Sequence, residues 1–113
     1  MDHEYYMDRA LELAREALAA GEVPVGCVIV WEDGTIVGEG RNRREEDGDA
    51  LGHAELAAIR MACDTVGGWR LQKATLYVTL EPCPMCAGAI LNARIPWYAM
   101  EPKTTGWGPA ALC

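Results

Sequence analysis

The first part of the chain carries apolar residues at a helical spacing. Over residues 5–20 they recur at intervals of three and four, the period of one face of an α-helix. These apolar residues are Met7, Leu11, Ala14 and Leu18. Gly21 follows at a position where helices commonly end. The pattern predicts an amphipathic helix over 5–20 that buries these four side chains.

Three later stretches have the composition of β-strands. "VPVGCVIVW" at 23–31 is almost uniformly apolar, which predicts a strand in the centre of a sheet that is covered on both faces. Asp33-Gly34 then predicts a tight hairpin turn into a second strand, "TIVGEGRN" at 35–42. A third strand is predicted for "ATLYVTL" at 74–80.

Two more helices are predicted, one before and one after the third strand. Residues 53–65 form the first, with Leu56, Ile59 and Met61 as its apolar residues, and a charged loop, "RREEDGDALG", precedes it. Residues 84–92 form the second, which begins at a proline and is rich in small residues. The resulting order, α-β-β-α-β-α, predicts an α/β fold with helices on both faces of a mixed sheet.

Composition and charge narrow the class of protein. A chain of 113 residues, half of them apolar, suits one small globular domain. It shows neither the apolar core of a signal peptide nor a run long enough to span a bilayer, so we expect a soluble, cytoplasmic protein. The net charge of −7 argues against general affinity for nucleic-acid backbones. The one compact basic cluster, "RNRR" at 41–44, is by itself interpreted as a solvated turn.

The cysteines point to metal or thiol chemistry. An odd number, five, in a chain expected inside the cell argues against a disulfide framework. Cys83 and Cys86 form a Cys-x-x-Cys at a predicted helix start, where the helix dipole and free N–H groups favour thiolates. Such a pair serves either as zinc ligands or as a thioredoxin-like redox pair, and the motif alone leaves both open. Cys27 and Cys63 are expected in the core, and Cys113 is terminal.

"GHAEL" at 52–56 favours the zinc interpretation. His53, Cys83 and Cys86 would give zinc three protein ligands and leave the fourth position to water, the layout of catalytic zinc sites. Residues two apart on a helix point about 200° apart. His53 must therefore lie at the irregular entry of its helix if Glu55 is to face the open position. A carboxylate there can take a proton from water and pass it to a leaving group.

These motifs together resemble those of a known family. "HAE" with "PCPMC" is similar to the signature of the zinc-dependent cytidine and nucleotide deaminases. "GEVPVGCVIV", "GRNR", "HAELAAIR" and "ATLYVTLEPCPMCAGAILNARI" resemble, more narrowly, the bacterial tRNA adenosine deaminases over residues 3–96. The resemblance implies a cytidine-deaminase-like three-layer α/β/α sandwich, one zinc per chain and a homodimer. It also implies hydrolytic conversion of the wobble adenosine of a tRNA anticodon to inosine, by attack of an activated water on a flipped-out adenine.

The resemblance further implies roles for single residues. By position these are the zinc ligands His53, Cys83 and Cys86, the proton carrier Glu55, and the substrate contacts Asn42 and Ala54. Without the resemblance, Asn42 would be interpreted as a turn-forming residue after "EGR".

Two other functions stay open at this point. One is deamination of a free base or nucleoside of the guanine or cytosine type, which needs no polyanion-binding surface and suits the acidic charge. The other is a catalytically impaired zinc-binding module that binds a partner. Glu55 argues against the second, because a purely structural zinc site needs no carboxylate over an open position.

Residues 97–113 depart from the family pattern. They show neither strand alternation nor helical periodicity, whereas the family continues there with a strand and later a long C-terminal helix. Reading the codons one base out of register forces a glycine across "ME" at 100–101 and another across "WG" at 107–108, where the family has glycines. We therefore expect a deaminase catalytic domain at 1–96 and an atypical tail at 97–113. We interpret the tail as a frameshifted ending that truncates or alters the C-terminal part.

Overall fold

The structure, a computed structural model, describes residues 3–80, 82–100 and 108–109. In chain order its elements are α1 (His3–Ala19), β1 (Gly26–Trp31), β2 (Ile36–Arg41), α2 (Arg44–Asp47), α3 (Ala54–Val66), β3 (Ala74–Val78), α4 (Pro84–Asn92), β4 (Trp97–Met100) and β5 (Gly108–Pro109). The strands form one sheet in the order β2-β1-β3-β4-β5. β1 is antiparallel to both β2 and β3, and β4 is parallel to β3, so the sheet is mixed.

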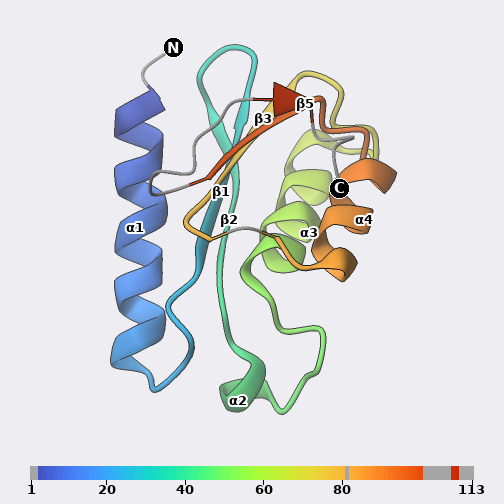
Figure 1. Cartoon of the computed structure of the whole chain (residues 1–113). Coiled ribbons are helices and arrows are strands. Elements are labelled where there is room, and N and C mark those ends of the chain that lie inside the picture. Colours follow the sequence, from blue (N-terminus) through green and yellow to red (C-terminus); the bar gives the residue numbers. More distant parts are fainter. Residues whose placement is uncertain (1–2, 81, 101–107, 110–113) are drawn as a thin grey trace.

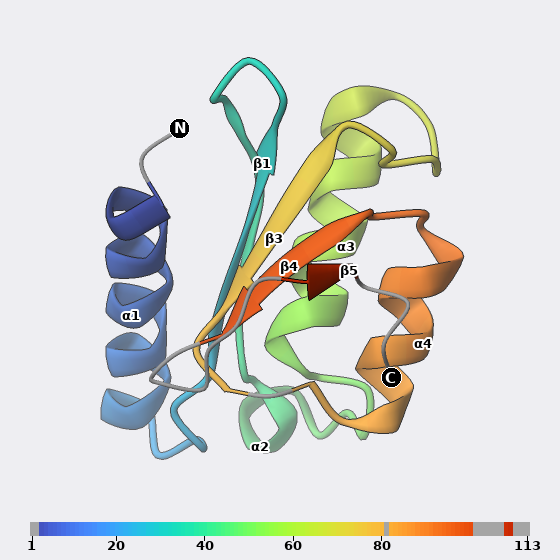
Figure 2. The ribbon, with the colours of Figure 1, turned by 45° about the horizontal axis from the view of Figure 1, so that its top comes forward.

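The helices cover the sheet on both faces. α1 lies on one face, whereas α3 and α4 lie side by side on the other (Figures 1 and 2). β1 runs through the middle of this sandwich, and its side chains alternate between the two faces. Val28 and Val30 pack toward α1, whereas Cys27 and Ile29 pack toward α3. The predicted three-layer α/β/α arrangement with a central, fully covered β1 is confirmed.

The face of α1 that packs on the sheet differs from the one predicted. Its buried residues are Tyr6, Met7, Ala10, Leu13, Ala14 and Ala17. Leu18 is 61% exposed, so its predicted burial is wrong, and Leu11 is only partly buried. The buried stripe is centred about 100°, one residue step, away from Leu18. The large leucines of the three-and-four pattern therefore lie along the edge of the packed face.

α3 packs through its alanines because it lies very close to β2. A Cβ atom built on Gly38 would be 2.2 Å from the carbonyl oxygen of Ala58, and one on Gly40 would be 2.4 Å from that of Ala54. Only small residues fit between elements at this separation, and the buried helix residues besides Glu55 are Ala54, Ala58 and Ala62. Met61, one of the apolar residues named for this helix, is 48% exposed.

Two segments have secondary structure that the sequence did not predict. The charged loop contains α2, whose first turn is held by the buried carboxylate of Glu22, as described below. Residues 97–100 form β4, so the expectation of no strand there is wrong. Residues 101–107 and 110–113 lie outside the described part of the chain. The frameshifted ending stays a prediction. Among the described residues, no helix is both long and apolar enough to cross a bilayer.

Candidate metal centre and active site

Two helix starts meet at one end of the sandwich and bring the predicted residues together. His53 is the N-cap of α3 and has extended backbone angles, φ −91° and ψ 149°. Cys83 is the N-cap of α4 and is likewise extended, with φ −72° and ψ 168°. Neither side chain caps its own helix, so both are available to other partners. The prediction that His53 lies at the entry of its helix is confirmed.

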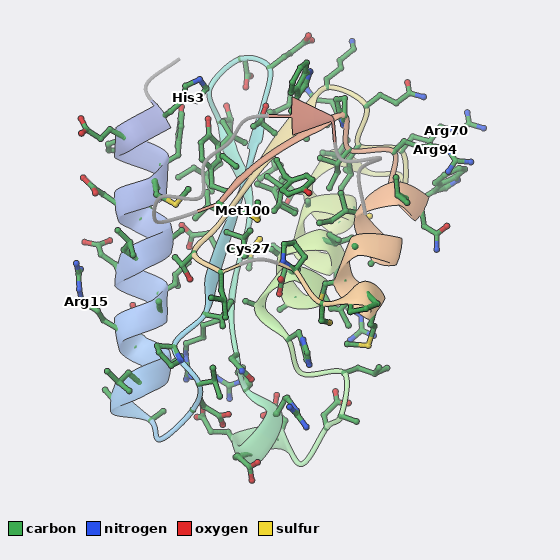
Figure 3. The ribbon with its side chains drawn as sticks, in the orientation of Figure 1. His3, Arg15, Cys27, Arg70, Arg94 and Met100 are labelled. Carbon is green, nitrogen blue, oxygen red and sulfur yellow. The ribbon has the colours of Figure 1, made fainter. Side chains whose placement is uncertain are left out.

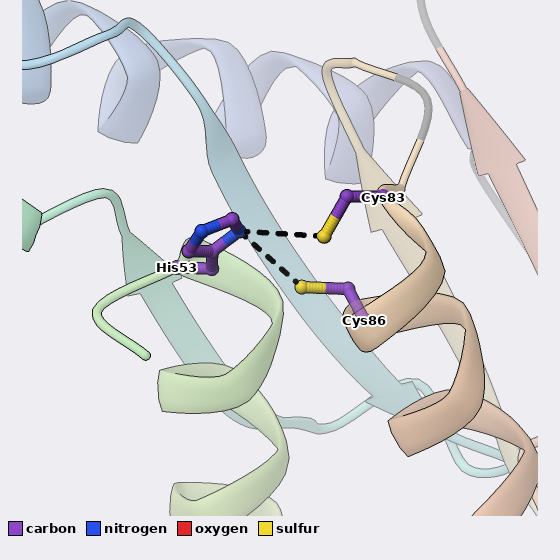
Figure 4. A group of neighbouring side chains, drawn as sticks. All are labelled: His53, Cys83 and Cys86. Carbon is purple, nitrogen blue, oxygen red and sulfur yellow. Dashed lines mark hydrogen bonds between the residues drawn. The ribbon is translucent and has the colours of Figure 1, made fainter. Parts of the chain in front are cut away.

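The three predicted ligand atoms form a compact triangle (Figure 4). Nδ1 of His53 lies 3.7 Å from Sγ of Cys83 and 3.6 Å from Sγ of Cys86, and all three donor atoms lie within 4.8 Å of one another. Zinc–sulfur bonds of about 2.3 Å and zinc–nitrogen bonds of about 2.0–2.1 Å at tetrahedral angles would separate N from S by about 3.5–3.6 Å. The donor set therefore fits a tetrahedral zinc ion, with one position left for a non-protein ligand.

Burial controls the acidity of one of the two sulfurs. Burial, together with the nearby Glu55 carboxylate and Cys83, raises the pKa of the Cys86 thiol. For Cys86, burial thus opposes the effect expected from the helix start. A dication would reverse the shift by binding the thiolate directly, and His53 beside both sulfurs completes a donor set that a redox pair does not need.

Glu55 lies in the first turn of α3, next to these ligands. Its side chain is buried at 3% exposure, and it is hydrogen-bonded to Cys86. Burial raises the pKa of the Glu55 carboxyl above its ordinary value. A buried carboxyl group with a raised pKa beside a metal site is a candidate for a general acid–base group.

A cavity of about 160 Å³ opens beside these residues. Its lining residues are Val23, Val25, Asn42, Arg44, His53, Ala54, Glu55, Leu80 and Cys83. It is smaller than the roughly 300 Å³ at which pockets for drug-sized ligands begin. The cavity therefore has room for one small group beside Glu55 and the metal ligands.

Both predicted substrate contacts line this cavity. Ala54 is fully buried at the start of α3. Asn42 is 6% exposed, and its Oδ1 accepts a hydrogen bond from the backbone N–H of Arg44 at 3.1 Å. Asn42 thus forms the turn that its residue type predicts and also faces the cavity.

Several cavity residues were missed by the sequence interpretation. Val23, Val25 and Leu80 were assigned to strands, but β1 begins at Gly26 and β3 ends at Val78, so these residues lie in the flanking loops. Val23 is 57% exposed and Leu80 is 51% exposed, which gives the cavity an apolar mouth. The proline after Val23 is a signal that the strand begins later.

The remaining cysteines of the described chain lie outside the donor group. Cys27 is fully buried in the sheet between α1 and α3 (Figure 3), as predicted, and burial raises the pKa of its thiol. Cys63 lies on α3, is partly buried and packs against the core. Cys113 is outside the described residues.

Comparison with known proteins gives a consistent set of similarities. The family model for the cytidine and deoxycytidylate deaminase zinc-binding region matches residues 1–100. A tRNA-specific adenosine deaminase of Streptococcus pyogenes (serotype M18, strain MGAS8232) is 52% identical over 95 residues, which cover 84% of this chain and 59% of that protein. The chain therefore spans less than two thirds of the length of that relative.

Two solved structures are similar in both fold and sequence. One comes from a study of A-to-I editing by tRNA:A34 deaminases at the wobble position of transfer RNA. It has a TM-score of 0.82 and 48% identity, and the match covers 91% of this chain and 81% of that one. The other is a guanine deaminase from Bacillus subtilis, with a TM-score of 0.84 and 44% identity, covering 89% of this chain and 64% of that one.

Proposed function

We propose, from the premise that this chain belongs to the cytidine and deoxycytidylate deaminase zinc-binding family, that it is a zinc-dependent hydrolase acting on adenosine in tRNA. The observation that carries the proposal is the 52% identity to a tRNA-specific adenosine deaminase over the stretch that contains the donor triangle and Glu55. Similarity to a wobble-position deaminase structure supports the anticodon wobble adenosine as the substrate.

The proposed zinc ligands are His53, Cys83 and Cys86, and their spacing supports this assignment. Two thiolates and one neutral imidazole also balance the charge of a dication. When bound there, zinc supplies Lewis-acid activation of a water molecule at neutral pH. The ligands sit on two N-caps and one first turn, so their positions follow from the packing of α3 and α4.

Glu55 is the proposed proton carrier. It takes a proton from the attacking water and gives it to the departing amino group, so that a C6–O bond forms, the C6–N bond breaks and ammonia leaves. Glu55 ends the cycle in the protonation state in which it began. Its burial beside the donor triangle and its raised pKa support this role, because catalytic acid–base groups commonly carry perturbed pKa values.

Asn42 and Ala54 are proposed to hold the base in the cavity. Both line it, and the amide of Asn42 offers hydrogen-bonding groups to a base edge. The exposed apolar side chains of Val23 and Leu80 at the mouth offer a surface for the base or its sugar. The proposal includes a homodimer that acts in the cytoplasm on the anticodon stem-loop, for which the support is the family resemblance.

Deamination of free guanine is a second candidate. It is favoured by the 44% identity and TM-score of 0.84 to the B. subtilis guanine deaminase, and by the net charge of −7, which disfavours binding to a polyanion. Both candidates use the same metal ligands and Glu55, so they differ only in what enters the cavity.

A substrate panel separates the candidates. The zinc-loaded chain is incubated with an anticodon stem-loop RNA that carries a wobble adenosine, with guanine and with cytidine, and the deaminated products are quantified by chromatography. We expect inosine from the stem-loop and little product from the other two. If xanthine is the main product, guanine deamination replaces tRNA deamination as the proposed function.

A further inference from the structure

The basic cluster "RNRR" at 41–44 does not act as one patch. The guanidinium of Arg41 donates to both carboxylate oxygens of Glu46, at 2.6 and 3.3 Å. That of Arg43 donates to Asp47 at 3.2 and 3.3 Å. These ion pairs cancel the charges of two of the three arginines, which agrees with a solvated, internally paired turn. The third arginine of the cluster takes part in neither ion pair.

Arg44 differs from Arg41 and Arg43 in its interaction partners and in its position. In the part of the chain that the structure describes, its side chain has no ion pair and no hydrogen bond, and the residue is exposed. It also lines the 160 Å³ cavity together with Asn42, His53 and Glu55. A cationic side chain with no acidic partner therefore lies beside the candidate active site of a chain whose net charge is −7.

The backbone beneath Arg44 is held in place by buried groups. Its N–H donates to Oδ1 of Asn42 at 3.1 Å. The next two N–H groups, of Glu45 and Glu46, donate to the carboxylate of Glu22 at 3.2 and 2.7 Å, and Glu22 is only 5% exposed. Because the turn is fixed, less conformational freedom is lost when the side chain binds a ligand.

We propose that Arg44 binds a phosphodiester of the RNA strand next to the base that occupies the cavity; this inference rests on the proposed function. A base that enters a cavity of this size brings its flanking phosphates to the mouth, where Arg44 lies. A guanidinium matches two phosphate oxygens with two parallel N–H groups, which gives geometric specificity as well as charge. Arg44 is thus a residue that selects a polynucleotide over a free base.

The contact has a measurable electrostatic signature. Each phosphate neutralised on a single strand contributes about 0.7 to the slope of log affinity against log salt. Loss of Arg44 should lower that slope by about this amount. A substitution that only loosened the fold would weaken binding without changing the slope in this way.

The test compares Arg44→Ala and Arg44→Lys with Arg15→Ala. Arg15 is an exposed arginine on the outer side of α1, away from the cavity (Figure 3), so its loss changes the net charge equally. Binding of a labelled anticodon stem-loop to the zinc-loaded chain is measured by fluorescence anisotropy over a range of salt concentrations. We expect about tenfold weaker binding for Arg44→Ala, an intermediate loss for Arg44→Lys and no loss for Arg15→Ala. Zinc content and thermal unfolding of each variant are measured beside it.

A second set of RNAs identifies the phosphate. The linkages on either side of the wobble adenosine are replaced, one at a time, by a neutral methylphosphonate. On one of these RNAs, wild type and Arg44→Ala should bind equally. Equal losses for Arg44→Ala and Arg15→Ala, or a loss that persists on both neutral-linkage RNAs, would overturn the contact. Tight stem-loop binding without inosine would contradict the proposed function while leaving this comparison intact; no binding of the stem-loop by wild type would contradict the contact itself.

Discussion

The two faces of the sheet are packed by the same strands but carry different chemistry. The face under α1 buries large aliphatic and aromatic side chains; they include Tyr6, Met7, Leu13, Val28, Val30 and Tyr77. The face under α3 and α4 buries aliphatic side chains too, such as Ile29, Leu76 and Ile90, and in addition the titratable groups Cys27, Glu55 and Cys86. Both faces therefore bury apolar surface, and the face under α3 and α4 also holds the reactive groups of the candidate site.

Close helix–strand contacts occur on both faces, but they have different consequences for the candidate site. A Cβ built on Gly26 would be 2.0 Å from the carbonyl oxygen of Ala10, in the middle of α1. One built on Gly40 would be 2.4 Å from that of Ala54, in the first turn of α3. Because that first turn also contains Glu55 and follows His53, the contact at Gly40 sets the geometry of the site as well as the packing.

The largest expected effect is loss of a metal ligand on the reactive face. Cys86→Ala should lose the zinc and much of the stability, because zinc binding at such sites contributes directly to folding. Cys63→Ala, on the same face but outside the donor group, is the matched control and should keep about one zinc per chain. Metal content and thermal unfolding are measured for both variants. Full zinc occupancy in Cys86→Ala would remove this residue from the ligand set.

A smaller effect, but a sharper comparison, comes from the two glycines. Gly26→Ala and Gly40→Ala both force a helix away from the sheet and should each lower the free energy of unfolding by about 1–3 kcal/mol. Only Gly40→Ala should also weaken zinc binding, since it displaces the start of α3. Urea unfolding and zinc titration against a competing chelator give the two quantities. An equal loss of zinc affinity in both variants would show that the two faces are not separable.

The smallest effect concerns the charge of Glu55 in the zinc-free chain. Burial raises the pKa of its carboxyl, so the folded chain holds this proton more tightly than the unfolded chain. Ionised Glu55 then lowers stability as the pH rises above the unfolded-state value of about 4.3. Zinc-free Glu55→Gln should be more stable than the zinc-free wild type at pH 7. The difference should vanish below about pH 4, where both side chains are neutral. Urea unfolding across this pH range tests it, and a less stable variant at pH 7 contradicts it.

The sequence predicted the elements well but the packed surfaces less well. α4 (Pro84–Asn92) has the predicted bounds, since a proline start and a run of small residues mark it locally. Leu18 was expected inside and is exposed, and Met61, an apolar residue of the second predicted helix, is exposed as well. Periodicity shows that a helix has an apolar stripe, but not how closely it approaches the sheet. That distance depends on Gly38 and Gly40, in a different element.

The residues of the candidate site differ in how far the sequence alone predicted them. His53, Glu55, Cys83 and Cys86 stood out because their types and spacing have few other uses. Arg44 and Glu22 did not, because their importance depends on contacts between segments far apart in the chain. β4 was missed because four residues are too few to show alternation, and its pairing with β3 becomes visible only in the sheet.

The most direct test of the proposed chemistry is a paired measurement on one sample. Zinc content and inosine formation on the anticodon stem-loop are determined for the same preparations of wild type and Glu55→Gln. We expect about one zinc per chain in both, and inosine formation slower by about 10²–10⁴-fold or more in the variant, because only the proton carrier has been removed. A Glu55→Gln chain that keeps its zinc and forms inosine at the wild-type rate would contradict the assignment of Glu55.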